Sequence, residues 1–563
     1  MSFSIPVHLR KYIVSQNYER YSFEDQAVWR FIIKGIFKNL YSHGQTEVLN
    51  SLIKKGIDTD KIPRITDIDK KIKSFGWRAV GISGFIPPRA FMEFQKHKII
   101  PIASDLRRIH HIFYTSAPDI VHEAVGHIPF LTHPVFSQFL FTYAETVLKS
   151  ISSQEDLEKY KAIRDLSDLK ENPKTRLTQI KKQERKLKQI IKNISHVSEA
   201  SYLSRLIWWT SEYGLMGDFK NPKIYGAGLI SSIGEFLHVK KIKKLRLSLK
   251  CIEYPFDITN FQPQLFVAKD FEHILDILGT LSKKLAFNKG GTYGVQQALR
   301  SKTVNTVVLD SGLQISGILE NSFFNNRYVN FLKFKGPVQL CYKNKQLKGH
   351  GINYHKEGYS SPLNTLNSSS KNMFLWNQKD ILKIGLKKNK KANLIFKGGI
   401  YLKGEFVSEL RVDKKLLLLK FRNCLITDSK NNLLYHPSWG MFDLAVGSKV
   451  VSVFSGPADF KAYNLKDDFK PSQVAVKKFT KKQLYRHLLY KKIKQVKIQN
   501  QVISLLKEIK KQKNNWLLLL ELFQIVKNKE DLKKQVLSDL NSLKNVKIQG
   551  NSVITMGKRF YKI

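Results

Sequence analysis

Apolar residues recur at helical spacing through roughly the first 300 residues of the chain. The segment DQAVWRFIIKGIFKNLY, residues 25–41, is one example and predicts an amphipathic helix. The stretch GWRAVGISGFIPP, residues 76–88, is rich in Gly and Pro and is predicted to be loop. Residues 153–195 are densely charged, as in IKKQERKLKQIIKNI, which predicts a solvated helical insertion of the hairpin kind.

The pattern changes near Lys302. Stretches such as TVNTVVLDSGLQISGIL and GSKVVSVFSG are β-branched or alternating, with turn residues between them, and predict a β-rich domain over residues 302–465. A polar loop over residues 348–372 interrupts this domain. From residue 466 to residue 563 the chain returns to Lys-rich helical periodicity. We therefore expect a mainly α domain over 1–301, a β-rich domain of unknown role, and a C-terminal, mainly helical region.

The length and composition of the chain are sufficient for several hydrophobic cores. The chain has 563 residues and 42% apolar residues, which favours two to four domains and excludes global disorder. Its three cysteines form no CxxC pair, so neither a disulfide framework nor a cysteine metal knuckle is indicated. The N-terminal residues lack a signal-peptide pattern, and no apolar run reaches membrane-spanning length. We expect a cytoplasmic protein with no membrane partner.

The charge is strongly basic, at +49. Such a balance can indicate a nucleic-acid partner. Here the excess is mostly Lys, is spread along the chain and lacks interleaved aromatic residues, so we expect no nucleic-acid partner.

The segment SAPDIVHEAVGHIPFLTHPVF, residues 116–136, carries candidate chemistry. Pro118 fits a first helical turn and Pro129 discourages continuation, so a short helix should carry His122 and His127. A zinc-protease helix needs its two His four residues apart, whereas these are five apart. Five residues of an ideal α-helix leave the two rings roughly 140° apart. They meet at one metal if the helix distorts at Gly126; otherwise they are two unrelated histidines.

A third ligand is offered by RLIWWTSEYGLMGD, residues 205–218, an apolar and aromatic helix with one internal acid, Glu212. Burial of a lone acid is costly unless the acid is paired or bound to a metal. Two imidazoles and one carboxylate would form a facial triad with open positions, which suits non-haem Fe(II) that activates O₂.

Five short sequence motifs, in the same order along the chain as in a known protein family, carry a resemblance to that family. They are FGWRAVGISGFIP, PDIVHEAVGHIPFL, WWTSEYGL, YGAGLISSIGE and FQPQLFVAKDF. Over about residues 5–300 the chain resembles the biopterin-dependent aromatic amino acid hydroxylases, in particular the large bacterial type with a C-terminal extension. The resemblance implies the fold of their catalytic domain for residues 1–301, with Fe(II), a tetrahydropterin and O₂ as cofactors and co-substrate.

The resemblance also implies roles for individual residues. His122, His127 and Glu212 are the implied iron ligands and catalytic residues. Trp77 matches the aromatic residue that stacks on the pterin, and Glu123 matches an acid beside it. Arg107 falls where the family holds the substrate carboxylate, a task that suits a guanidinium. The remaining implied substrate-pocket residues are Thr115, Trp208, Gly228 and Ser231.

The implied reaction is ring hydroxylation of an aromatic amino acid, with phenylalanine 4-monooxygenase activity expected. Ile258 lies in a family loop near the active site, and its aliphatic side chain suits phenylalanine. Tyrosine and tryptophan stay open as substrates, because an apolar pocket rejects an added hydroxyl poorly. A zinc hydrolase, or a basic binding protein with a relic catalytic domain, are the alternatives from other classes. The family's short tetramerising tail is replaced by about 260 residues, so the oligomeric state is open.

The β-rich region contains GHGINYHKEGYSSP, residues 349–362. His350 and His355 could form a second metal site. The sequence alone favours ordinary loop histidines with satisfied hydrogen bonds.

Overall fold

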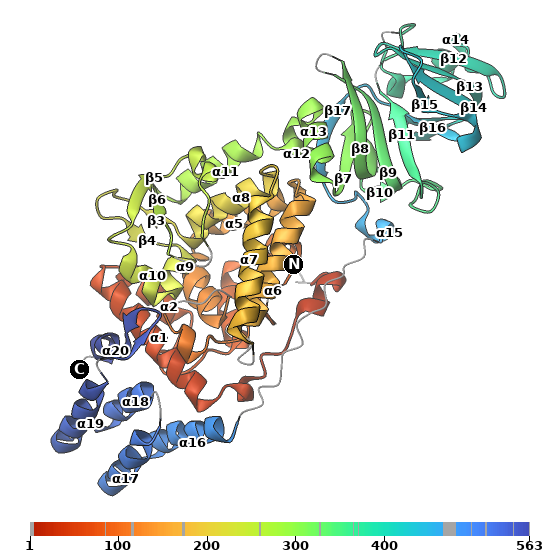
Figure 1. Ribbon diagram of the computed structural model, residues 1–563. Coiled ribbons are helices and arrows are strands. Elements are labelled where there is room, and N and C mark those ends of the chain that lie inside the picture. The colour runs from red at the N-terminus through yellow and green to blue at the C-terminus, as the bar shows by residue number, and fades with distance from the viewer. Residues whose placement is uncertain are drawn as a thin grey trace. The chain divides into compact units, whose positions relative to one another are not determined.

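The chain folds into two compact units (Figure 1). The computed structural model describes residues 5–84, 86–113, 118–171, 175–257, 261–325, 328–363, 365–369, 371–464, 480–496, 498–512, 515–543 and 545–561. Unit 1 comprises Met1–Glu145, Ser204–Leu278 and Phe469–Ile563, and unit 2 comprises Thr146–Leu203 and Gly279–Asp468. This division differs from three domains in series. The C-terminal helices group with the N-terminal helices, and the charged insertion groups with the β-rich region.

Helices dominate the first 301 residues, as their periodicity predicts. The predicted helix at 25–41 is α1, which begins with a capping box formed by Ser22 and Asp25. The α-helices are α1 (Phe23–Ser42), α2 (Thr46–Lys54), α3 (Ile65–Ile72), α4 (Pro88–Lys96), α5 (Pro134–Lys149), α6 (Gln154–Glu171), α7 (Leu177–Lys192), α8 (Glu199–Ile207), α9 (Ala227–Ser231), α10 (Ile233–His238), α11 (Phe271–Ser282), α12 (Ala286–Lys289) and α13 (Gly291–Ser301).

Two small sheets lie among these helices. The prediction of loop for residues 76–88 is wrong, because β1 (Arg78–Ile82) pairs in parallel with β2 (Ile99–Ala103). The partner is supplied by a segment beyond α4, which a local Gly and Pro count does not reveal. The second sheet has the order β4-β3-β6-β5, from β3 (Leu215–Met216), β4 (Lys223–Ile224), β5 (Lys243–Arg246) and β6 (Gln264–Ala268).

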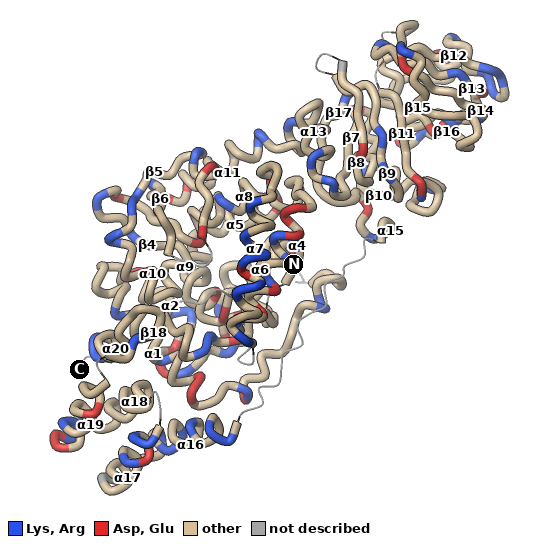
Figure 2. The backbone as a smooth tube through the Cα atoms, in the orientation of Figure 1, with Lys and Arg blue, Asp and Glu red and all other residues tan. Residues whose placement is uncertain are grey.

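The charged insertion forms the helices α6 and α7, which lie side by side. A small cluster of Ala162, Leu166 and Leu187 joins them. Lys170 and Glu184 form an ion pair 3.0 Å long across the hairpin. Lys and Arg mark the length of α7 in Figure 2, as expected for a solvated charged face.

The C-terminal helices complete unit 1. They are α16 (Lys481–Gln495), α17 (Gln499–Lys510), α18 (Trp516–Val526), α19 (Glu530–Ser542) and α20 (Val553–Tyr561), with the short hairpin β18 (Lys547–Ile548) and β19 (Asn551–Ser552) before α20. The apolar run of α18 packs inward. The ring of Phe31 in α1 lies 5.2 Å from that of Trp516 and 5.3 Å from that of Phe560, centroid to centroid.

Unit 2 is built on two antiparallel sheets. The first has the order β10-β9-β8-β7-β17, with β11 also paired to β9; the second has the order β12-β13-β14-β15, with β16 also paired to β14. The strands are β7 (Val304–Leu309), β8 (Leu313–Asn325), β9 (Tyr328–Tyr342), β10 (Lys345–Gln346), β11 (Gly358–Pro362), β12 (Lys391–Phe396), β13 (Ile400–Val412), β14 (Lys415–Asp428), β15 (Leu433–Tyr435), β16 (Phe442–Ala445) and β17 (Val450–Ser455), with the helices α14 (Gln378–Lys383) and α15 (Phe460–Tyr463).

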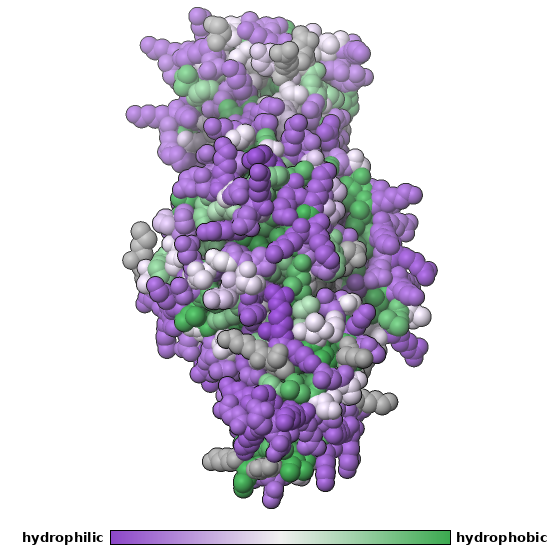
Figure 3. Space-filling model, turned by 90° about the vertical axis from the view of Figure 1, so that its left-hand side faces the viewer, coloured by the Kyte–Doolittle hydropathy of each residue, from purple (hydrophilic) through white to green (hydrophobic). Residues whose placement is uncertain are grey.

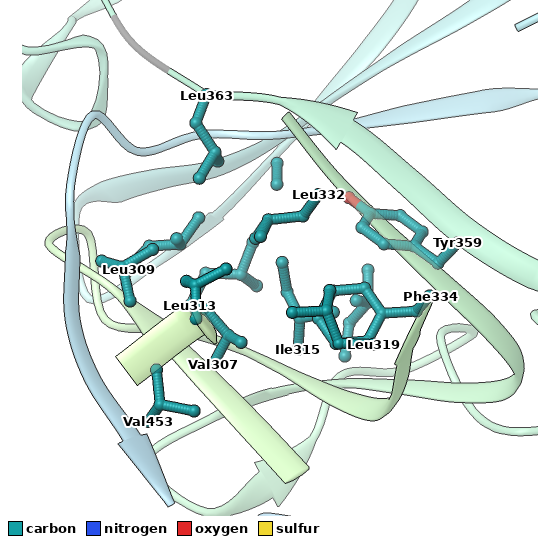
Figure 4. Packing of buried hydrophobic residues seen from close by; sticks show 14 of the residues in the cluster. Val307, Leu309, Leu313, Ile315, Leu319, Leu332, Phe334, Tyr359, Leu363 and Val453 are labelled. Carbon is teal, nitrogen blue, oxygen red and sulfur yellow. The ribbon is translucent and has the colours of Figure 1, made fainter. Parts of the chain in front are cut away.

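A hydrophobic core packs against the first sheet (Figure 4). Alternate positions of its strands point inward, as period-2 patterning requires. The core also takes in Leu417 and Leu418 of β14, so both sheets contribute to it. Its labelled members are Val307, Leu309, Leu313, Ile315, Leu319, Leu332, Phe334, Tyr359, Leu363 and Val453.

The face of the molecule shown in Figure 3 is mostly polar. In Figure 3, hydrophilic residues cover most of the visible face, with hydrophobic residues in separate smaller areas. Lys and Arg are distributed over both units in Figure 2. Within the part of the chain that the structure describes, no helix combines the length and the apolar character needed to cross a membrane.

Candidate functional site

His122 and His127 lie on one π-helical turn, η5 (His122–His127). The N–H of Ile128 donates to the carbonyl of Glu123, the five-residue spacing of a π-helix. This wider turn returns two residues that are five apart to the same side, which an ideal α-helix would not do. Their ring centroids are 5.0 Å apart. The distortion that the spacing required is therefore present over the whole turn.

Glu212 ends a second π-helical turn, η7 (Trp208–Glu212). The N–H of Tyr213 donates to the carbonyl of Trp208 over 2.8 Å. Glu212 Oε2 lies 3.2 Å from His122 Nε2, and Glu212 Oε1 lies 3.2 Å from His127 Nε2. One ligand atom from each of the three residues lies within 4.8 Å of the others. The three predicted ligands thus converge on one point from two π-turns.

Serine hydroxyls hold the far sides of both imidazoles. His122 Nδ1 lies 3.3 Å from Ser231 Oγ, and His127 Nδ1 lies 3.5 Å from Ser211 Oγ. A partner on one ring nitrogen fixes the ring orientation and the tautomer that presents the other nitrogen to a metal. The resemblance implies a substrate-pocket role for Ser231, and in the structure its hydroxyl contacts the imidazole of His122.

The charges of the group are coupled. Burial lowers the pKa of His122, but the carboxylate of Glu212 overcomes this and raises the pKa to about 9. Burial alone would raise the pKa of Glu212, yet His127 and His122 hold it well below its ordinary value. The Glu212 carboxylate is therefore ionised and stabilises a proton on the His122 imidazole. A bound dication would displace that proton.

Arg107 is buried beside this group. Its Nε and Nη2 donate to the two carboxylate oxygens of Asp119, each over 2.8 Å, and its Nη1 donates to the carbonyl of Ser231 over 2.9 Å. The N–H of His122 also points to Asp119 Oδ1, 3.3 Å away. Of the five N–H groups of the guanidinium, these contacts within the described residues use three. Arg107 is thereby fixed to the helix that carries His122.

Glycines let the ligand-bearing segments approach closely. A Cβ on Gly126 would lie 2.6 Å from the Cβ of Ala227 in α9. A Cβ on Gly228 would lie 2.8 Å from the ring of Tyr213. Gly228, assigned to the substrate pocket by the resemblance, thus has a packing role in the structure. Tyr213 in turn stacks on Trp208, with centroids 5.0 Å apart.

The indole of Trp208 is partly exposed, and contacts with two neighbouring side chains fix its orientation. Its indole N–H donates to Gln262 Oε1 over 3.0 Å, and its ring stacks on Phe256 at 4.1 Å. A fixed indole with an exposed part suits the wall of an aromatic pocket. Thr115 and Ile258, the other residues proposed for substrate contact or choice, lie outside the described residues.

Trp77 does not fit the stacking role assigned to it. Its side chain is fully buried at 0% exposure, and its N–H donates to Ser137 Oγ over 2.7 Å. A ring packed on both faces by protein offers no surface to a pterin, so Trp77 is a core residue in this structure. The sequence could not separate these roles, because a lone Trp after Gly76 fits either.

Glu123 is the better candidate for contact with the pterin. It is 2% exposed, and its Oε2 has no hydrogen-bond partner among the described residues. Burial is the main cause that raises its pKa, to about 8. A buried and unsatisfied carboxyl oxygen is costly unless a ligand completes it. The atom fits a group that brings its own N–H donors, as a pterin ring does.

A model of the biopterin-dependent aromatic amino acid hydroxylases matches residues 12–164 and 194–315. The gap between the two matched stretches falls in the charged helical insertion. The matched stretches contain all three residues of the metal group. The chain belongs to this family. It is therefore a biopterin-dependent aromatic amino acid hydroxylase.

Relatives of this hydroxylase include two bacterial phenylalanine-4-hydroxylases. That of Chromobacterium violaceum is 26% identical over 270 residues, 47% of this chain and 76% of the relative. That of Pseudomonas aeruginosa is 25% identical over 257 residues, 45% of this chain and 81% of the relative. A solved structure of the C. violaceum protein with bound iron(III) and 7,8-dihydrobiopterin matches with a TM-score of 0.38 and 25% identity, over 50% of this chain and 94% of that one.

Sequence reasoning gave Asp119 and Ser211 no role in the hydroxylase site, and it named Gly126 only as the place where the helix would distort. Asp119 fixes Arg107 and the start of the ligand helix, and Ser211 holds His127. Gly126 carries the close contact with α9. The position of Asp119, three residues before His122, was the available signal; the contacts of Ser211 and Gly126 arise only from tertiary packing.

Proposed function

We propose that this hydroxylase binds Fe(II) through His122, His127 and Glu212 and converts phenylalanine to tyrosine. The observation that carries the proposal is the convergence of the two Nε2 atoms and the Glu212 carboxylate on one point. Two neutral imidazoles and one carboxylate leave open positions on a metal, which suits non-haem iron. The names of the bacterial relatives support phenylalanine as the substrate.

When bound, iron and a reduced pterin supply the activation of O₂. The side chains of this chain supply positioning. Ser231 and Ser211 orient the two imidazoles, and Glu212 contributes the negative charge of the ligand set. Glu123 offers its unsatisfied Oε2 to the pterin.

Arg107 is proposed to hold the substrate carboxylate. Asp119 and Ser231 fix its guanidinium, so a bidentate contact to a carboxylate loses little side-chain entropy. Trp208 is proposed as one wall for the aromatic ring. Fixing the carboxylate and the ring together would hold the substrate in one orientation.

The test is product analysis. The purified Fe(II)-loaded protein receives a tetrahydropterin, O₂ and an equimolar mixture of phenylalanine, tyrosine and tryptophan. We expect tyrosine from phenylalanine, with no product from His122→Ala and full activity from His97→Ala, an exposed histidine of the same unit. A different hydroxylated product would keep the reaction class and change the substrate. No product from a protein with bound iron would overturn the proposal.

A further inference from the structure

A second group of metal-ligating side chains lies in unit 2, far along the sequence from the hydroxylase motifs. His350 and His355 come from the loop between β10 and β11, and Asp443 comes from β16. One ligand atom from each lies within 4.8 Å of the others. The two histidines are 6% and 7% exposed and Asp443 is 3% exposed. The sequence favoured ordinary loop histidines; the structure instead buries both beside a carboxylate from the other sheet.

Backbone hydrogen bonds hold the loop in place. The carbonyl of His350 accepts from the N–H of Leu340, and that of His355 accepts from the N–H of Val338, each over 3.0 Å. Both partners lie on β9. The backbone of both histidines is therefore fixed to a strand of the first sheet, although they stand in a loop rich in glycine.

The carboxylate is held from the second sheet. Asp443 pairs in register with Lys420 of β14, whose Nζ lies 3.6 Å from Asp443 Oδ1. The other oxygen, Oδ2, lies 3.9 Å from His350 Nδ1. Tyr359 also donates to the carbonyl of Asp443 over 2.8 Å. Lys420 thus holds one carboxylate oxygen while the other faces the histidines, as partners behind metal ligands do.

The spacing of the nitrogens fits a tetrahedral ion. His350 Nδ1 and His355 Nε2 are 3.3 Å apart, within hydrogen-bond reach of each other. Two imidazole nitrogens bound to one tetrahedral zinc at about 2.0–2.1 Å are themselves about 3.3 Å apart.

We infer that His350, His355 and Asp443 form a second metal site, which binds a divalent transition metal of the zinc type independently of the hydroxylase centre. Three protein ligands leave a fourth position for water or a small anion. An open pocket lies against the same loop and is lined in part by Gly349, Gly351 and Tyr354. Since Tyr354 also stacks edge-on against His355, at 4.7 Å, this pocket adjoins the site.

The experiment separates the two sites. The full chain carrying His122→Ala and His127→Ala, which lacks two ligands of the hydroxylase centre, is stripped with a chelator and titrated with Co(II), then with Zn(II). We expect one bound equivalent and the visible absorption of tetrahedral Co(II). Failure of the folded double variant to bind either ion would overturn the inference, whatever the outcome for hydroxylation.

Further substitutions in that background locate the ion. Asp443→Asn and His355→Ala should each weaken Co(II) binding by at least about tenfold. His436→Ala is the matched control, because His436 is an exposed histidine of the same unit that bonds to Ser438. Circular dichroism establishes folding of each variant. Unchanged Co(II) affinity in a folded His355→Ala variant would also overturn the inference.

Discussion

Arg30 of α1 and Glu521 of α18 form a buried ion pair, although 491 residues separate them. Arg30 Nε lies 2.8 Å from Glu521 Oε2, and Tyr561 donates to Oε1 over 3.0 Å. Both charged side chains are less than a tenth exposed. The C-terminal helices are thus bound into unit 1 by a charge network as well as by the rings around Phe31.

Glu521→Gln should destabilise unit 1 by about 3–5 kcal/mol, because it leaves the charge of Arg30 buried without a partner. Calorimetric unfolding of the full chain measures the effect. The control is Glu530→Gln, which breaks the exposed pair with Lys533 and should cost less than about 1 kcal/mol. The double change Arg30→Met with Glu521→Leu should recover most of the loss; equal stability of Glu521→Gln and wild type would contradict this account.

Glu212→Gln should remove most iron binding while the fold persists. The amide keeps the shape of the side chain but loses the charge that the two histidines stabilise. We expect iron affinity to fall by about 100-fold or more, read from metal content after dialysis against graded chelator. Glu253→Gln, an exposed acid in the same unit, serves as the control. Retention of iron by the Glu212 variant would place the metal elsewhere.

Arg107→Lys should raise KM for phenylalanine more than it lowers kcat. Lysine keeps the charge but cannot hold Asp119 and a substrate carboxylate in forked contacts. Losing a charged hydrogen bond costs about 1.5–3 kcal/mol, or about 10–100-fold in kcat/KM. Arg108→Lys, the exposed neighbour, should change nothing. Phenylethylamine, which lacks the carboxylate, should lose no activity with the Arg107 variant; an equal loss for both compounds would indicate a purely structural role.

Gly126→Ala adds only one methyl group but should weaken iron binding at the metal centre. The added Cβ would meet the Cβ of Ala227 at 2.6 Å, which forces η5 away from α9. Overpacking of this kind costs about 1–3 kcal/mol, and we expect iron affinity to fall at least about tenfold. Gly279→Ala on α11, where an added Cβ meets nothing within 4 Å, is the control and should preserve both stability and iron binding. A Gly126→Ala variant with normal iron affinity would show that this contact does not shape the site.

Glu235 should make stability fall as pH rises. Its two carboxylate oxygens have no hydrogen-bond partner among the described residues, and burial, with help from Asp257, raises its pKa from 4.5 to about 8. Between these values the folded chain keeps a proton that the unfolded chain has lost, so this group reduces stability as pH climbs through the window. The slope is at most about 1.4 kcal/mol per pH unit.

Glu235→Gln should flatten that dependence. Thermal unfolding midpoints from pH 5 to pH 8 measure it, with the exposed Glu272→Gln as the control. The Gln variant should gain stability over wild type toward pH 8. Parallel pH curves for the two proteins would show that Glu235 does not titrate in this window.

The ligand residues could be predicted from the sequence because their types and order are chemically specific. Their geometry could not. His122 and His127 fit an α-helical pattern with diverging rings, and only the structure shows the π-turn that aligns them. Glu212 likewise ends a π-turn, which the spacing of hydrophobic residues does not predict. The turn also packs closely on α9 at Gly126, a contact that local sequence does not reveal.

Long-range contacts explain the remaining differences. The strand β1 was missed because its partner β2 lies beyond α4 in the sequence. Trp77 was assigned to the pterin because the sequence does not show that its side chain is buried against α5. The helices after residue 480 were predicted as helices from their periodicity. Their place in unit 1 rests on contacts such as Phe31 with Trp516, which no local pattern reveals.

The segments of the two units alternate along the sequence, and this order has a consequence for biosynthesis. Phe31 leaves the ribosome long before Trp516 and Phe560, the rings that cover it. At about 5–20 residues per second, α1 waits on the order of 25–100 s for its partners. The whole of unit 2 is made within that interval, since its segments lie between Thr146 and Asp468. A chaperone that binds α1 during translation would therefore protect an apolar face that the nascent chain cannot yet cover itself.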